Sequence, residues 1–90
     1  LLQTAKTSLE IKRKVLEHFT EENLYPYARF YLRNIKERFQ SYWHNHFSTI
    51  GVIGMNEAAL NLHGVSIATD EGNRFGMRTL SFMRNQFMEF

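Results

Sequence analysis

Residues 46–53 read His-Phe-Ser-Thr-Ile-Gly-Val-Ile, and this stretch decides the fold class that the sequence predicts. Its β-branched residues, which favour extended backbone, are Thr49, Ile50, Val52 and Ile53. Apolar side chains fall on both alternating faces, a pattern typical of a strand buried on both sides in a parallel sheet or barrel. The N–H and C=O groups of a lone strand need partners, so we expect residues 46–53 to find them outside this chain or in a second copy.

Helical periodicity surrounds the predicted strand on both sides. Pro26 suits the first position of a helix, Gly64 suits the end of one, and Thr69 and Asn56 suit N-caps. The predicted elements are helices over residues 4–20, 26–43, 56–63 and 70–90, the strand over 46–53, and a short extended piece over 65–68. The predicted fold class is therefore mainly α with one or two short β-strands, as a slice of an α/β barrel.

The two ends of the chain support the interpretation as a slice. The chain begins at Leu1, and it ends at Phe90 within an apolar helical pattern that has no Gly or Pro stop. We therefore expect residues 1–90 to be a single fragment of a larger protein. The alternative is a true C-terminal helix that packs on its own core.

Composition limits the chemistry that the chain can carry. Its 90 residues amount to one domain or a piece of one. They include no cysteine, which excludes disulfides, cysteine-ligated metal sites and thiol chemistry within this stretch. Hydrophobic residues make up 43% of the chain and aromatic residues 14%, which indicates a globular rather than a disordered protein.

Charge and hydropathy exclude two classes of partner. The net charge is only +2, and acidic residues are interleaved with the basic ones, so we predict no nucleic-acid partner. No apolar run approaches the roughly 20 residues of a membrane span, and we expect no signal peptide. We accordingly expect a cytoplasmic protein without a membrane partner.

Three short motifs have stronger structural than functional interpretations. His44-Asn45-His46 lacks the ββα context of an HNH nuclease and a nearby third ligand for a metal, so we predict no metal site. Lys12-Arg13-Lys14 is interpreted as solvated helix surface. The glycines of Gly51-x-x-Gly54 precede a helix in the manner of a phosphate loop, but Glu57 in the first turn would repel a phosphate.

The polar residues around the predicted strand are the candidates for a site. The carboxyl end of a barrel strand is where active sites gather, so Asn56 and Glu57 are the best candidates for facing a cavity. Ser48 and Thr49 are weaker candidates within the strand itself. No Ser/His/Asp arrangement stands out, so we assign no catalytic residue to the chain.

The stretch from Asn45 to Ala59, Asn-His-Phe-Ser-Thr-Ile-Gly-Val-Ile-Gly-Met-Asn-Glu-Ala-Ala, resembles the catalytic subunit of anaerobic (class III) ribonucleoside-triphosphate reductases. Leu24-Tyr25-Pro26-Tyr27 and the segment from Ser8 to Lys14 also resemble that family. The segment from Gly64 to Gly72, with the helix that follows, resembles ribonucleotide reductases generally. The resemblance covers nearly the whole chain.

This resemblance implies a ten-stranded α/β barrel that makes deoxyribonucleotides for DNA replication by glycyl and thiyl radical chemistry. It implies a glycyl radical, zinc and allosteric nucleotides, including ATP, in the parent enzyme. The implied partners are the rest of the reductase chain and a radical S-adenosylmethionine activase. No glycyl-radical, thiyl-cysteine or zinc-ligand motif falls within residues 1–90, so the fragment itself is expected to be cofactor-free scaffold without activity.

A second hypothesis is an independent small helical module for protein–protein interaction. Its predicted helices carry apolar residues on more than one face, which indicates a buried partner on one of them. Bare faces of this kind drive self-association, and under either hypothesis we expect self-association of the isolated chain.

Overall fold

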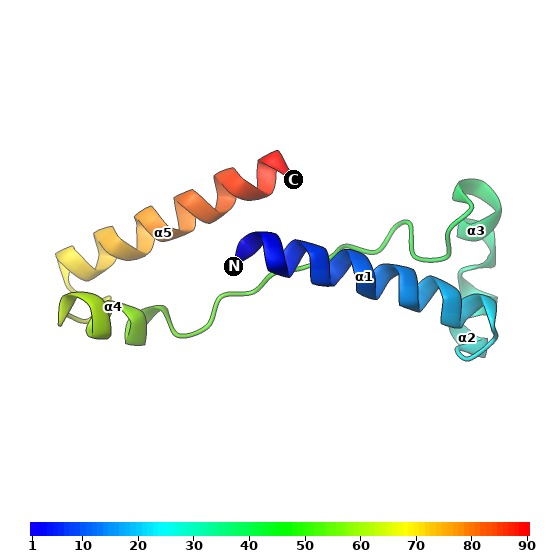
Figure 1. Ribbon diagram of the computed structural model, residues 1–90, viewed down its shortest axis with the longest axis horizontal. Coiled ribbons are helices and arrows are strands. Elements are labelled where there is room, and N and C mark those ends of the chain that lie inside the picture. Colours follow the sequence, from blue (N-terminus) through cyan, green and yellow to red (C-terminus); the bar gives the residue numbers. More distant parts are fainter. The chain divides into compact units, whose positions relative to one another are not determined.

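The computed structural model describes residues 1–90, which are 69% helical and contain no β-strand (Figure 1). Five helices follow one another, and their bounds are α1 (Leu2–Glu21), α2 (Pro26–Tyr31), α3 (Arg33–Phe39), α4 (Met55–His63) and α5 (Asp70–Glu89). Two compact units divide the chain: the first comprises Leu1 and Gln3–Thr49, and the second comprises Leu2 and Ile50–Phe90. The predicted fold class, a barrel slice with one or two strands, is therefore wrong for this chain.

The first unit is built on α1, which is slightly longer than the helix predicted over residues 4–20. The chain leaves α1 by a tight turn in which Asn23 has a positive φ of 61°. The backbone N–H of Leu24 donates to the carbonyl of Phe19 (2.9 Å), which closes this turn against the end of the helix. Thr20, near the C-terminus of α1, is completely buried.

The helix predicted over residues 26–43 is instead two short helices, α2 and α3, separated at Leu32. The Arg33 guanidinium donates to the Phe30 carbonyl (2.7 Å), an acceptor that a continuous helix would offer to the backbone N–H of residue 34. Helix α3 ends at Gln40, whose φ of 62° is left-handed. Pro26 occupies the first turn of α2, as the sequence predicts.

The strand predicted over residues 46–53 is absent because it has no partner to pair with. His46 still belongs to a turn, in which its N–H donates to the carbonyl of Trp43 (3.1 Å). Residues 47–53 then run as an uncoiled trace toward α4 (Figure 1). A strand exists only as a member of a hydrogen-bonded ladder, so β-branched residues alone do not produce one.

The second unit is a hairpin of α4 and α5 joined by a short turn (Figure 1). Gly64 ends α4 with a φ of 70°, and the Thr69 hydroxyl accepts from the N–H of Gly72 (3.1 Å) at the start of α5, which confirms both predicted helix signals. The short extended piece predicted over residues 65–68 is a turn, in which the N–H of Thr69 donates to the Ser66 carbonyl (3.0 Å).

Glycines on α5 allow this turn to lie directly against the helix. A Cβ at Gly72 would overlap the carbonyl of Ser66, and a Cβ at Gly76 would lie 3.2 Å from Cδ1 of Ile67. Both glycines are buried. They stand in a helix interior at a cost of roughly 1 kcal/mol each relative to alanine, which the close approach of the turn explains.

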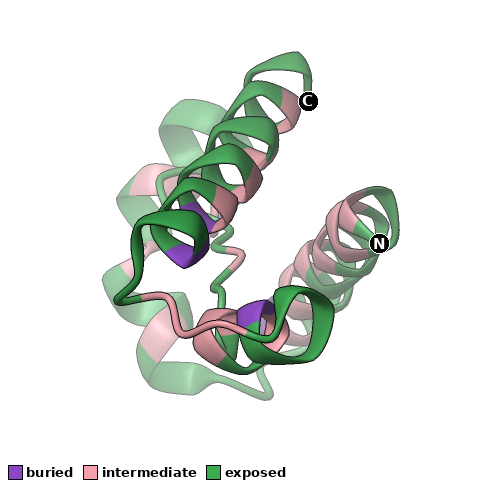
Figure 2. Ribbon diagram, turned by 90° about the vertical axis from the view of Figure 1, so that its left-hand side faces the viewer, coloured by how far each residue is buried: buried purple, intermediate pink, exposed green.

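Few residues are buried in either unit, as Figure 2 shows. The buried residues are Thr20, Tyr42, Ala59, Gly72 and Gly76. Each of the five helices carries exposed large apolar side chains. The most exposed ones away from the chain ends are Tyr27, Tyr31, Phe47, Ile53, Leu62 and Met88. Apolar surface of this extent indicates that these side chains are suited to contacts with other protein.

Candidate functional site

A polar stripe on α1 organises the first unit. Arg13, Glu17 and Thr20 are spaced four and three residues apart, so they share one face of the helix. Each of them bonds the chain segment that follows α3, which extends from Ser41 to Thr49. We call these three residues the α1 polar stripe.

Glu17 holds the turn after α3 by its carboxylate. It accepts hydrogen bonds from the backbone N–H of Tyr42 (2.8 Å), the hydroxyl of Ser41 (2.9 Å) and the backbone N–H of Trp43 (3.3 Å). The Lys36 ammonium lies 3.5 Å from the same carboxylate. Burial alone would raise the pKa of Glu17, but these donors together favour the charged form and lower its pKa below the usual value of 4.5.

The same turn is fixed at two further points. The indole N–H of Trp43 donates to the Thr20 hydroxyl (2.9 Å), and that hydroxyl donates to the Leu16 carbonyl (2.7 Å). Lys36 also pairs with Glu21 at 2.7 Å, and the hydrogen bond to this carboxylate raises the pKa of Lys36. Thr20 is therefore buried with both of its hydrogen-bonding roles satisfied.

Arg13 contributes to a groove between α1 and residues 43–49. Its guanidinium donates to the Trp43 carbonyl and to the Ser48 hydroxyl, each at 2.8 Å. We call this hollow the Arg13 groove; its lining residues are Leu9, Lys12, Arg13, Leu16, Trp43, His46, Phe47, Ser48 and Thr49. The polar groups of the groove are the Lys12 ammonium, the Arg13 guanidinium, the His46 imidazole and the hydroxyls of Ser48 and Thr49, and the Arg13 guanidinium is already bonded to the chain.

The interpretation of Lys12-Arg13-Lys14 needs correction at Arg13, and the candidates Ser48 and Thr49 lie next to it. Lys12 and Lys14 are exposed, as expected for solvated helix surface, but Arg13 between them is half-buried and bonded to the main chain. Ser48 and Thr49, predicted as weaker site candidates, both line the Arg13 groove. The hydroxyl of Ser48 already serves as the acceptor for Arg13.

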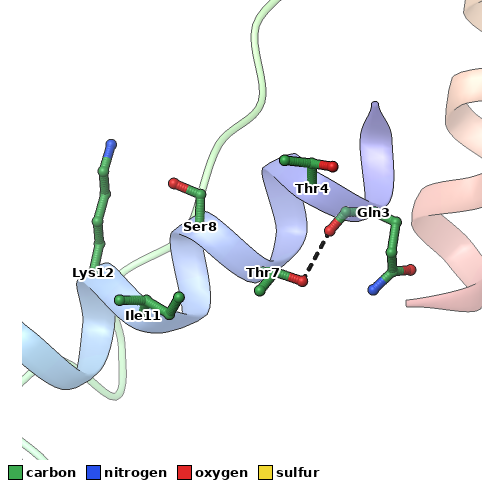
Figure 3. A pocket seen from close by; sticks show the side chains of 6 residues that line it. All are labelled: Gln3, Thr4, Thr7, Ser8, Ile11 and Lys12. Carbon is green, nitrogen blue, oxygen red and sulfur yellow. Dashed lines mark hydrogen bonds between the residues drawn. The ribbon is translucent and has the colours of Figure 1, made fainter.

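A second hollow, on the N-terminal half of α1, carries no site. Figure 3 shows its lining, which is Gln3, Thr4, Thr7, Ser8, Ile11 and Lys12. All six residues belong to one helix, and the Thr7 hydroxyl donates to the carbonyl of Gln3 (3.0 Å). One helix cannot enclose a ligand, so these residues form ordinary helix surface.

Asn56 and Glu57, the best candidates from the sequence, lie in the second unit at the start of α4. Asn56 is not the N-cap, because α4 begins at Met55 and Gly54 precedes it. Its side-chain carbonyl accepts from the backbone N–H of Ile67 (2.9 Å) and lies 3.3 Å from the Ser66 hydroxyl. Asn56 thus holds the turn between α4 and α5, as a half-buried structural residue.

Glu57 is exposed in the first turn of α4 and bonds no other side chain. A carboxylate at this position interacts favourably with the helix dipole. Its negative charge would also oppose a phosphate at this helix N-terminus.

Histidines in this chain pack on aromatic rings. His44 stacks on Phe39 with ring centroids 4.2 Å apart and an interplanar angle of 9°, whereas His46 meets the edge of Trp43 at 4.8 Å. No group of three or more His, Asp or Glu side chains lies close enough to hold a metal ion. None of the five helices has the length and hydropathy required to cross a bilayer.

Glu17 and Thr20 were not predicted as functional residues from the sequence. Their spacing from Arg13 was a readable signal, because polar residues at i, i+4 and i+7 form a stripe on one helix face. Their partners in the segment after α3 lie 23 to 26 residues away in sequence. No local pattern identifies those partners.

Together these features define a class of protein segment: a helical piece, fastened by polar side chains to its own main chain, with much apolar surface left exposed. The family model for anaerobic ribonucleoside-triphosphate reductase matches residues 1–90, so the chain belongs to this family. Its general function is anaerobic ribonucleotide reduction. Comparisons with curated proteins and with solved structures gave no match.

Proposed function

We propose that residues 1–90 form a scaffold segment of the catalytic subunit of an anaerobic ribonucleoside-triphosphate reductase. The subunit would convert ribonucleoside triphosphates to deoxyribonucleotides by glycyl and thiyl radical chemistry. The observation that carries the proposal is the match of the family model to all 90 residues. The well-fastened segment from Ser41 to Ser48 and the α4–α5 turn support a positioning role.

The cofactors of such an enzyme do not fit the residues of this segment. A thiyl radical requires a cysteine, and residues 1–90 contain none. A cysteine-ligated zinc lacks its ligands for the same reason, and no cluster of His, Asp and Glu substitutes for them. We therefore propose that the radical and the metal belong to other parts of the reductase chain.

A test of the proposal uses the complete reading frame that contains residues 1–90. The whole protein is activated anaerobically by a radical S-adenosylmethionine activase and supplied with a ribonucleoside triphosphate and either formate or a thiol reductant. We expect deoxyribonucleotide product from the whole protein and none from residues 1–90 alone. Turnover by residues 1–90 alone, or no turnover by a whole protein that carries a glycyl radical by electron paramagnetic resonance, would contradict it.

We also propose that Glu57 faces the nucleotide pocket of the whole enzyme. Its carboxylate has no structural partner within the chain, so it remains available. Glu57→Gln in the complete reductase should raise KM for the ribonucleotide about ten- to hundredfold, the effect of losing a hydrogen bond of roughly 1.5–3 kcal/mol to a charged group. Glu71→Gln is the matched control, because Glu71 is also an exposed acid in the first turn of a helix. Equal KM values for the two variants would contradict the proposal that Glu57 faces the nucleotide pocket.

The second function, a protein-interaction module, is favoured by the exposed apolar residues of α5. Met77, Leu80 and Phe82 are between 47% and 59% exposed, which is unusual for large apolar side chains that face only water. The reading-frame experiment separates the two functions, since an independent module would have no catalytic protein around it.

A further inference from the structure

One face of α2 carries three large aromatic side chains that are exposed to solvent. Tyr27, Phe30 and Tyr31 are 81%, 57% and 74% exposed. They are spaced three and four residues apart, so they share one face of the helix. Exposed apolar side chains gathered in this way mark a surface that contacts another molecule.

Arg33, the first residue of α3, completes this cluster. Its guanidinium lies over the Phe30 ring, 4.0 Å from the ring centroid, and donates to the Phe30 carbonyl (2.7 Å). Two contacts with the same residue hold the guanidinium in place and leave its other N–H donors unused. We call Tyr27, Phe30, Tyr31 and Arg33 the α2 aromatic patch.

The charge around the α2 aromatic patch is one-sided. Residues 26–39 contain one acidic side chain, Glu37, and four basic ones, which are Arg29, Arg33, Lys36 and Arg38. Lys36 pairs with acids of α1, whereas none of the three arginines forms an ion pair. A fixed guanidinium without a carboxylate, beside exposed rings, suits a partner that supplies carboxylates and apolar side chains together.

We propose that the α2 aromatic patch is covered by an acidic segment of the same reductase subunit, outside residues 1–90. A carboxylate of this segment pairs with Arg33, and its apolar side chains pack on the three aromatic rings. Tyrosine and arginine are among the residues that contribute most to protein interfaces. The inference rests on the proposed function, because the remainder of the reductase subunit supplies the partner.

Two observations favour this occupant over others. Permanent contacts are more apolar than transient ones, so large exposed rings indicate a contact that lasts, such as one within a subunit. A second copy fits less well, because a symmetric contact through the same patch would bring Arg33 close to Arg33 of the partner subunit, and like charges repel each other.

Zero-length cross-linking of the complete reductase tests the charged contact. Arg33→Lys places an amine at this position, and a carbodiimide joins an amine to a carboxylate that touches it. We expect an amide link, identified by mass spectrometry, from residue 33 to an Asp or Glu of the same subunit outside residues 1–90. In a mixture of isotope-labelled and unlabelled protein, both linked peptides should carry the same label. Arg78→Lys measures the background, because Arg78 is also exposed and forms no ion pair in the chain.

A second variant tests the apolar contact without disturbing the chain's own bonds. The Tyr27 side chain makes no hydrogen bond, ion pair or ring contact within residues 1–90, and alanine has the higher helix propensity. Tyr27→Ala should therefore weaken α2 only if a partner covers this position. In the complete reductase we expect amide hydrogen exchange of α2 to become at least about tenfold faster, the scale of losing an interface anchor. Lys14→Ala, on exposed surface of α1, should leave this exchange unchanged.

Two sets of results would overturn the proposal. The first is a link from residue 33 that does not exceed the Arg78→Lys background, or one that leads to a second copy or to another protein. The second is unchanged exchange of α2 in Tyr27→Ala, or protection of α2 that depends on an added single-stranded oligonucleotide. Both measurements use protein that has not been activated, so they are independent of turnover. Absence of turnover by the activated whole protein would instead contradict the proposed function.

Discussion

Replacement of Glu17 by alanine should destabilise the first unit more than any other single surface substitution on α1. The wild-type carboxylate accepts three hydrogen bonds from residues 41–43 at 2.8 to 3.3 Å. A hydrogen bond to a charged group contributes roughly 1.5–3 kcal/mol when well formed. The Glu17 side chain is 23% exposed, so water can replace part of what is lost. We expect a decrease of about 2–4 kcal/mol in the free energy of unfolding, within the range for loss of a bonded network.

The measurement is urea denaturation followed by tryptophan fluorescence. Trp43 is the only tryptophan in the chain, and it lies within the turn that Glu17 holds. Glu17→Gln keeps the shape of the side chain and one acceptor oxygen, so its loss should be smaller, at about 1 kcal/mol. Glu21→Ala is the control, because the exposed ion pair of Glu21 with Lys36 should contribute only about 0–1 kcal/mol.

Two results would refute this reasoning. If Glu17→Ala lies within about 0.5 kcal/mol of the wild type, the usual scatter of surface substitutions, the carboxylate does not hold the turn. If Glu21→Ala costs as much as Glu17→Ala, the effect comes from the charge near Lys36 and not from the three donors of the turn. An unchanged m-value is required for either comparison, since a changed one would mean a different denatured state.

Two further predictions concern pH and backbone packing. Because the folded-state pKa of Glu17 is lowered, its contribution to stability is present above the usual pKa of 4.5 and is lost as the pH falls through the lower folded value; Glu17→Gln should lack this part of the acid loss in a pH series of urea melts, and an unchanged slope would contradict the assignment. Gly72→Ala should destabilise the α4–α5 hairpin by about 1–3 kcal/mol, because its Cβ would overlap the Ser66 carbonyl. A Cβ at Gly51 would meet no atom within 4 Å, so Gly51→Ala should change stability by less than about 0.5 kcal/mol. Thermal melts of both variants test this, and equal losses for the two would contradict it.

Local signals in the sequence predicted the helix ends that depend on local chemistry. Pro26, Gly64 and Thr69 act through the backbone of their own turn, so their roles were readable without knowledge of the fold. The break at Leu32 was not readable in this way, because the apolar periodicity of residues 26–43 continues through it. At the break, the Arg33 side chain bonds the Phe30 carbonyl, three residues earlier.

The strand over residues 46–53 failed for a different reason. Its β-branched composition predicts a preference, but a strand forms only when a second strand supplies hydrogen bonds. The chain contains no second strand, so these residues remain unpaired extended backbone. Similarly, Asn56 was predicted as a helix cap from its local position, whereas its actual partner is Ile67, eleven residues further along the chain.

The α1 polar stripe explains how a segment with so few buried residues still holds a defined shape in its first unit. Arg13 and Glu17 bond backbone groups of Tyr42 and Trp43, and Thr20 accepts from the Trp43 indole, so hydrogen bonds from α1 hold the segment at both its main chain and its side chains. Because these hydrogen bonds hold the segment, large apolar side chains around it can remain exposed and available for contacts with other protein. A segment built in this way can present a fixed backbone to one neighbour and apolar surface to another. These are the two properties that a scaffold segment of a larger enzyme requires.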